Sequence, residues 1–359
     1  MHPNDTKTIR AYTDPRVSRQ SNMETVRILA MSMILTLHII AHTSVIHVFP
    51  TIRYFMPIVV GGVDLFILIS GYYTIKLTWK SVLWFVILVW AFQTCILASL
   101  YITGNIGSIS YLTIIGTYMN PLVNNEYWFI QKYFMLMLIS PLFNTALKHI
   151  TNYRYAYLLA LLTIIDIYAF WMMQLYNKNT GVSLYNFIYL YVLGQSISRF
   201  NVKGRIKPGV IVAAGLISLM LNLIINALTL WYFSSDFGSY MNSYTYNYCN
   251  PLTITVCVCV IILMSKQEYY SKIINSVASA SLGAYLLQDG LLGTLFTYNY
   301  QSQALNASVT RFAVLTVAIF LSYWVVSWLI TYIMRYVYIR LTRCLDKIIP
   351  SRYKFNFAE

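Results

Sequence analysis

The stretch RILAMSMILTLHIIAH, residues 27–42, decides the fold class. It belongs to an apolar run that is long enough, as a helix, to cross the roughly 30 Å hydrocarbon core of a bilayer. Similar runs recur along the 359-residue chain, which is 58% hydrophobic and only 10% charged. A soluble domain of this length does not hide so much apolar surface. The sequence therefore predicts an all-α fold, a polytopic integral membrane helix bundle.

Ten membrane-spanning helices are predicted from the apolar runs. They cover about residues 25–48, 54–74, 81–101, 127–147, 155–175, 184–199, 209–231, 250–266, 273–296 and 311–335. With the N-terminus inside, all but four of the 25 basic residues fall on the cytoplasmic side. This bias is the positive-inside rule, and it predicts a multi-pass protein of the plasma (cytoplasmic) membrane with both termini inside. Because topology explains the net charge of +14, we expect the lipid bilayer and no nucleic acid as a partner.

The chain is divided into three segments. These are a cytoplasmic N-terminal segment (1–23), a transmembrane domain (24–335) and a basic cytoplasmic tail (336–359). The five cysteines are scattered, so neither a metal site nor a disulfide framework is predicted. The predicted outer loops 102–126 and 232–249 are the longest, and the second is rich in Tyr, Ser and Asn. Its tyrosines fit an interfacial belt or, alternatively, an aromatic surface for a sugar acceptor.

Three ionisable side chains share one face of the first predicted helix. Arg27 and His38 are eleven residues apart, which is three turns plus about 20°, and His42 follows one turn later on that face. Ionisable groups inside a span are costly and normally face a cavity or the bundle interior. Taken one at a time, each residue has a structural explanation. Arg27 could be an interfacial anchor, and each histidine could form hydrogen bonds to a neighbouring helix. The aligned stripe instead favours a functional site.

The second predicted span contains a deep acid, Asp64, about ten residues from either end of its apolar run. A buried carboxylate is rarely left unpaired. We therefore expect Asp64 to pair with His38 on the neighbouring helix, where it would fix the tautomer and stabilise the imidazolium. Gly61, Gly62 and Gly71 would permit the close backbone approach that such a contact needs.

Four segments resemble, in order, those of a known family. They are NMETVRILAMSMILTLH (22–38), GVDLFILISGYY (62–73), YWFIQKYFMLMLISPLFN (127–144) and SLGAYLLQD (281–289). They are similar to the signature segments of the multi-spanning membrane acyltransferases, often called acyltransferase family three. The ten-span plan is also similar to that family's.

The resemblance implies transfer of an acyl group, commonly acetyl, from cytoplasmic acetyl-CoA to a surface-directed sugar. The acceptor implied is a hydroxyl of a surface glycan or a lipid-linked oligosaccharide precursor. Arg27 and His38 match the arginine and histidine regarded as essential in the family. The last segment of the family often ends in histidine, whereas this chain has Gln288. Gln288 can bond a substrate but is not expected to transfer a proton.

The chemistry assigns roles to the predicted residues. A sugar hydroxyl needs a positioned base at neutral pH, and we assign His38 as that base with Asp64 as its orienting partner. The phosphates of acyl-CoA would be held by Arg27, Lys76 and Lys80, although both lysines fit topological anchors equally well. The residues expected to bind substrate are His42, Trp128, Tyr133, Tyr285 and Gln288.

Two other classes of protein fit part of the pattern. A transporter or flippase also needs polar groups at mid-membrane, but no pair of Gly/Pro-broken helices in symmetric halves is evident. A non-catalytic assembly component of a polysaccharide export system would keep the same scaffold, and Gln288 slightly favours this alternative. A test for transfer or hydrolysis of acyl-CoA by the purified protein distinguishes an acyltransferase from a transporter and from a non-catalytic component.

Overall fold

The computed structural model describes residues 20–104, 110–123, 127–173, 182–232, 244–289 and 297–348. The regular elements in these ranges are all helices, which confirms the all-α class. The longest are α2 (Ser21–His42), α6 (Trp79–Ile102), α8 (Trp128–His149), α13 (Pro208–Tyr232) and α19 (Val309–Ile348). Those of intermediate length are α5 (Gly62–Tyr73), α7 (Tyr111–Val123), α9 (Asn152–Ile165), α11 (Leu184–Arg199) and α15 (Pro251–Ser265). The short elements are α3 (Val45–Val48), η1 (Pro50–Phe55), α4 (Met56–Val59), η3 (Asp166–Met172), α12 (Val202–Arg205), α16 (Lys272–Ala278), α17 (Ser281–Asp289) and α18 (Tyr298–Ala307).

Several helices fit a multi-pass membrane protein. In the described ranges, six helical runs are long and apolar enough to cross a bilayer: Ser21–His42, Pro50–Tyr73, Trp79–Ile102, Asn152–Met172, Pro208–Tyr232 and Val309–Ile348. The predicted count of ten is not confirmed. Helices α11 and α15 have 16 and 15 residues, which as helix cover about 23–24 Å of the roughly 30 Å core. The predicted span 273–296 is interrupted by a turn at residues 279–280, between α16 and α17.

Element boundaries differ from the prediction at two further places. Helix α7 lies within the segment 102–126, which was predicted as a loop. Helix α19 continues past residue 335 to Ile348, because its 40 residues contain neither proline nor glycine. Of the other predicted segments, residues 1–19, 233–243 and 349–359 lie outside the described residues.

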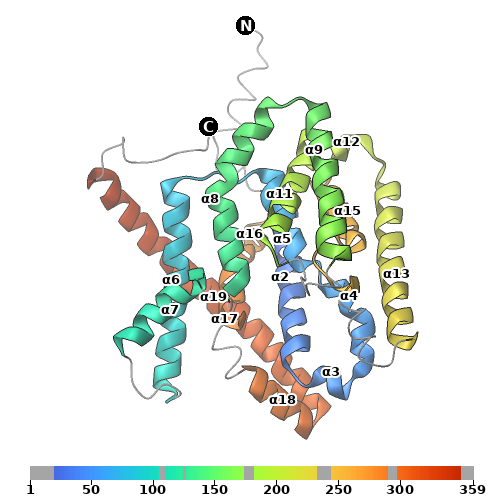
Figure 1. The fold of residues 1–359 in the computed structure, drawn as a ribbon. Coiled ribbons are helices and arrows are strands. Elements are labelled where there is room, and N and C mark those ends of the chain that lie inside the picture. The colour runs from blue at the N-terminus through green and yellow to red at the C-terminus, as the bar shows by residue number, and fades with distance from the viewer. Residues whose placement is uncertain are drawn as a thin grey trace.

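Helix α2 lies inside the bundle. It packs against α5, α15, α16 and α17, while α5 packs most extensively on α11, and α17 and α18 pack on α19. Figure 1 shows α13 along one edge, α6 and α7 at the opposite edge, and α2 and α5 between them. The packing therefore places the beginning of the chain beside α17, which follows some 240 residues later.

Glycines set the spacing between α2, α5 and α11. A Cβ atom at Gly62 would lie 2.6 Å from the carbonyl oxygen of Ala30 in α2. A Cβ atom at Gly71 would overlap the backbone of Tyr191 in α11, where Gly194 faces it. These contacts involve backbone atoms, which cannot rotate aside as a flexible side chain can. The close approach expected at Gly62 and Gly71 is therefore present.

Gly71→Ala is expected to destabilise the fold. The added methyl group would overlap the Tyr191 backbone, and overpacking of this kind costs about 1–3 kcal/mol. Gly116→Ala in α7 is the matched control, because a Cβ atom there meets nothing within 4 Å. Thermal unfolding of the purified proteins should show a lower midpoint for Gly71→Ala only. Equal midpoints in the two variants would contradict this account of the α5–α11 contact.

Candidate functional site

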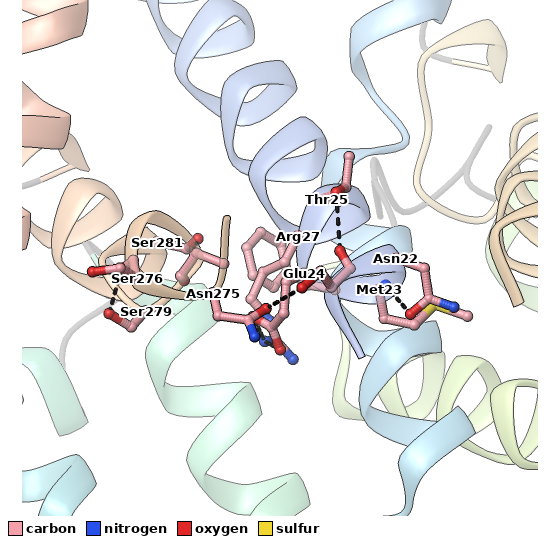
Figure 2. A network of polar contacts seen from close by, with 12 residues as sticks. Asn22, Met23, Glu24, Thr25, Arg27, Asn275, Ser276, Ser279 and Ser281 are labelled. Atoms are coloured by element: carbon pink, nitrogen blue, oxygen red, sulfur yellow. Dashed lines mark hydrogen bonds and ion pairs between the residues drawn. The ribbon is translucent and has the colours of Figure 1, made fainter. Parts of the chain in front are cut away.

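Polar residues fix the start of α2. The side-chain amide of Asn22 donates to the carbonyl oxygens of Met264 (2.9 Å) and Gln267 (2.6 Å), at the end of α15. The Ser21 hydroxyl donates to Oδ1 of Asn275 in α16 (2.9 Å). Figure 2 shows this end of α2, with Asn22, Glu24 and Arg27, beside Asn275 and the turn that follows it. The sequence around Asn22 thus anchors the helix on which the ionisable stripe lies.

Arg27 is held by an acid on its own helix. Its Nη1 donates to both carboxylate oxygens of Glu24, at 2.6 and 2.5 Å. The Glu24 side chain is 6% exposed and that of Arg27 is 26% exposed. Because the carboxylate takes only one guanidinium nitrogen, Nη2 and Nε are not part of this ion pair and can face a ligand.

A cavity is lined by Arg27 of α2 and by Tyr285 of α17. It measures about 310 Å³, within the range of small-molecule sites, and lies between α2, α5, α6, α8 and α17. Apolar and hydroxyl-bearing side chains line it, including Ser70, Trp84, Tyr133 and Tyr285. We call it the Arg27 cavity. It suits a slender chain with few charges.

A larger cavity adjoins the first. It measures about 800 Å³, and three basic side chains line it: Lys80, Lys272 and Arg335. The wall residues common to both cavities are Ser81, Trp84 and Ser279. The second cavity, here called the basic cavity, also contains Trp328 and Tyr332. Its charge and aromatic content suit an anionic ligand with a planar ring.

The two predicted lysines lie in different places. Lys80 is in the basic cavity, where its Nζ also donates to Oδ2 of Asp346 at 2.8 Å. Lys76 instead lines a separate cavity of about 290 Å³ with Lys148 and Arg199. The structure therefore places Lys80 in the basic cavity, which adjoins the Arg27 cavity, and Lys76 in a separate cavity. From the sequence, Lys272 and Arg335 were used only to predict the membrane orientation. Their proximity to Lys80 was not predicted, because 190 or more residues separate them from it in the chain.

His38 lies among aromatic rings and one acid. The ring centroids of His42 and Tyr285 are 5.8 and 6.2 Å from that of His38. Its Nδ1 is 3.7 Å from Oδ1 of Asp289, and the two side chains are 12% and 13% exposed. His42 stacks on Tyr298, with ring centroids 4.9 Å apart. Since Tyr285 also lines the Arg27 cavity, it connects that cavity to His38.

The acid beside His38 is Asp289 and not Asp64, so the expected contact between His38 and Asp64 is wrong. Asp64 is fully buried in the first turn of α5, and neither of its carboxylate oxygens has a hydrogen-bond partner among the described residues. The reason is the crossing of α2 and α5. Gly62 meets α2 at Ala30, which is about 12 Å along the helix from His38. A role of Asp64 in the reaction stays a prediction.

Two aromatic residues of the third signature segment have different surroundings. Tyr133 lines the Arg27 cavity, and its hydroxyl is 3.3 Å from that of Ser70. Trp128 packs its ring on Phe187 and Tyr248, with centroids 6.1 and 5.5 Å away. The structure thus brings Tyr133, but not Trp128, into the same cavity as Arg27.

Gln288 is a fully buried link between α17 and α2. Its Nε2 donates to the carbonyl oxygen of Leu35 at 2.8 Å, about one turn before His38. Its backbone carbonyl accepts from the Tyr298 hydroxyl at 3.3 Å. These bonds place α17, and with it Tyr285 and Asp289, against the histidine face of α2.

Gln288→Leu is expected to loosen this link without shifting the pH dependence of activity. Loss of a buried hydrogen bond costs a net of about 0.5–1.5 kcal/mol, so the thermal midpoint should fall. The pH–rate profile should keep its position, because glutamine does not titrate. Thermal unfolding and a pH–rate profile of the purified variant check both parts. A displaced profile with an unchanged midpoint would instead indicate a role in proton transfer.

The comparison with protein families agrees with this architecture. The profile of a family described as an acyltransferase domain matches residues 20–332, which include α2, the Arg27 cavity, Asp289 and the residues of the basic cavity up to Tyr332. Comparisons with curated proteins and with solved structures find no match. The family match covers most of the chain and contains all four signature segments. The chain belongs to acyltransferase family three, and it is a membrane acyltransferase.

Proposed function

We propose that the protein is an O-acyltransferase that moves an acetyl group from cytoplasmic acetyl-CoA to a glycan hydroxyl. The acceptor is a cell-surface polysaccharide or its lipid-linked precursor. The observation that carries the proposal is the pair of adjoining cavities. Together they run from a basic, aromatic mouth past Arg27 to Tyr285, beside His38.

The cavities match the parts of the donor. Its phosphates would bind Lys80, Lys272 and Arg335, and its adenine would stack on the aromatic side chains of the basic cavity. The pantetheine arm, which is slender and uncharged, would occupy the Arg27 cavity. Arg27 and His38 are about 16 Å apart along the helix. An extended arm held near Arg27 would therefore carry its thioester toward His38.

The positive-inside distribution supports the orientation. The basic cavity would open to the cytoplasm, where acyl-CoA is made, because its cations belong to the predicted inner side. His42 lies one turn beyond His38 on α2 and would face the acceptor from the outer side. Donor and acceptor would thus approach His38 from opposite faces of the membrane.

The proposed reaction needs one base. His38 takes the proton from the acceptor hydroxyl while the hydroxyl oxygen attacks the thioester carbon. The new carbon–oxygen bond forms, the carbon–sulfur bond breaks, and the thiolate of CoA leaves. The imidazolium then gives its proton to that thiolate, which returns His38 to its neutral form. No metal takes part in this scheme.

The test is acetyl transfer by the purified protein in lipid nanodiscs. Radiolabelled acetyl-CoA is the donor, and surface polysaccharide from the producing cell, freed of esters by mild alkali, is the acceptor. We expect alkali-labile acetyl groups on the glycan and stoichiometric release of CoA. A transporter or an assembly component would give neither product. CoA release without glycan acetylation would contradict the proposed acceptor, and no CoA release would contradict the proposed reaction.

A further inference from the structure

We infer that Asp289 is the positioning residue of His38: it holds ring nitrogen Nδ1 and leaves Nε2 to take the proton of the acceptor hydroxyl. This inference rests on the proposed function, and it names the residue that prepares the base for that reaction. The carboxylate is contributed by α17, and the imidazole by α2.

The geometry pairs these two groups. Nδ1 of His38 lies 3.7 Å from Oδ1 of Asp289, an ion-pair distance somewhat longer than a hydrogen bond. In the described part of the chain, Nδ1 of His38 and Oδ2 of Asp289 are both buried atoms without a hydrogen-bond partner. Leaving such atoms unpaired costs about 1–3 kcal/mol each. A shift of about 1 Å would satisfy the ring nitrogen, and catalytic hydrogen bonds often tighten in this way when substrate binds.

The position of Asp289 permits that shift. It is the last residue of α17, while the preceding residue, Gln288, is bonded to the α2 backbone at Leu35. The helix is thus fixed beside α2, so the shift requires a change in the Asp289 side chain alone and no movement of α17. Tyr285 lies one turn earlier on α17, and its ring centroid is 6.2 Å from that of His38.

The groups around the pair support the assignment of the base. His42, Tyr285 and Tyr298 surround His38 and Asp289 from α2, α17 and α18. None of these is an acid. Among the described residues, Asp289 is the acid within ion-pair distance of His38, so its charge can stabilise an imidazolium there, and a buried charge acts strongly on such a neighbour.

The kinetic test compares variants at two acids. Asp289→Asn keeps a polar group but loses the charge, so kcat should fall about 10- to 1000-fold, less than the full effect of a general base. The KM for acetyl-CoA should stay within about threefold, since Asp289 does not line the donor cavities. Asp289→Glu should recover part of the rate. Asp166→Asn, which also removes a buried acid, is the matched control and should keep wild-type kcat.

A double variant distinguishes positioning from a structural effect. If Asp289 acts through His38, adding Asp289→Asn to His38→Ala should lower kcat no further. Asp64→Asn is measured alongside. A larger loss of kcat in Asp64→Asn than in Asp289→Asn would overturn the inference and return the orienting role to Asp64.

A second measurement does not depend on activity. Nitrogen NMR of protein with ¹⁵N-labelled histidine reports which ring nitrogen carries the proton, and the His38→Ala spectrum identifies the His38 signals. We expect protonated Nδ1 in the wild type and a mixture of tautomers in Asp289→Asn. Identical His38 signals in the two proteins would overturn the pairing. If wild-type protein transfers no acetyl group, the proposed function fails, while this spectrum still decides the pairing.

Discussion

His38→Ala is expected to lower acetyl transfer by about 10²–10⁴-fold, the usual contribution of a general base. The His38 side chain is 12% exposed and has Asp289 near its Nδ1. It lies beside Tyr285, which lines the Arg27 cavity. Alanine removes the base without changing the donor cavities, so binding of acetyl-CoA should persist. The expected signature is a large loss of kcat with little change in donor affinity.

The measurement is acetyl transfer at matched protein levels, with binding of acetyl-CoA determined separately by calorimetry. His149→Ala is the control, because His149 is an exposed residue at the end of α8. His42→Ala should act mainly on acceptor KM, since the His42 ring stacks on Tyr298 and lies further toward the end of α2. If His38→Ala keeps more than about a tenth of wild-type turnover, less than a general base contributes, His38 is not the base.

Arg27→Ala is expected to raise the KM for acetyl-CoA about 10- to 100-fold, which corresponds to the loss of a charge-assisted hydrogen bond worth about 1.5–3 kcal/mol. Arg27 lines the cavity assigned to the pantetheine arm, next to the basic cavity. Arg27→Lys should restore only part of the affinity, because an ammonium group lacks the planar fork of donors that can bind Glu24 and a ligand together.

The Arg27 experiment must separate binding from stability. Removal of the guanidinium breaks the ion pair between Arg27 and Glu24, whose side chain is 6% exposed, and breaking a buried pair is destabilising. The double variant Glu24→Gln/Arg27→Ala removes that charge, so it should regain stability but not donor affinity. Titration with acetyl-CoA and thermal unfolding of both variants give the two quantities. Wild-type affinity for acetyl-CoA in Arg27→Ala would contradict a role at the donor site.

The sequence by itself determined the class of fold and one face of the site. Apolar runs long enough to cross a bilayer require helices, because backbone groups in lipid must be satisfied within the segment. The 3.6-residue period then placed Arg27 and His38 on one face of α2. In the structure, Arg27 lines the same cavity as Tyr285 of α17, and the His38 ring lies beside that tyrosine. Gly62 and Gly71 marked close backbone contacts for a similar local reason, since a missing side chain can be read directly from the sequence. These features depend on local geometry.

Only the tertiary structure decided which groups meet. Hydropathy measures apolar content and does not register the turn at residues 279–280, so it predicted one span where α16 and α17 are separate. Asp64 was the acid on the nearest predicted span, but the α2–α5 crossing at Gly62 places it away from His38. Asp289, 251 residues from His38 in the chain, reaches it because α17 packs on α2. Lys272 and Arg335 likewise line one cavity with Lys80 because helices that are distant in the chain pack together. Such contacts arise from the packing of distant helices, and the period of one helix cannot specify its neighbours.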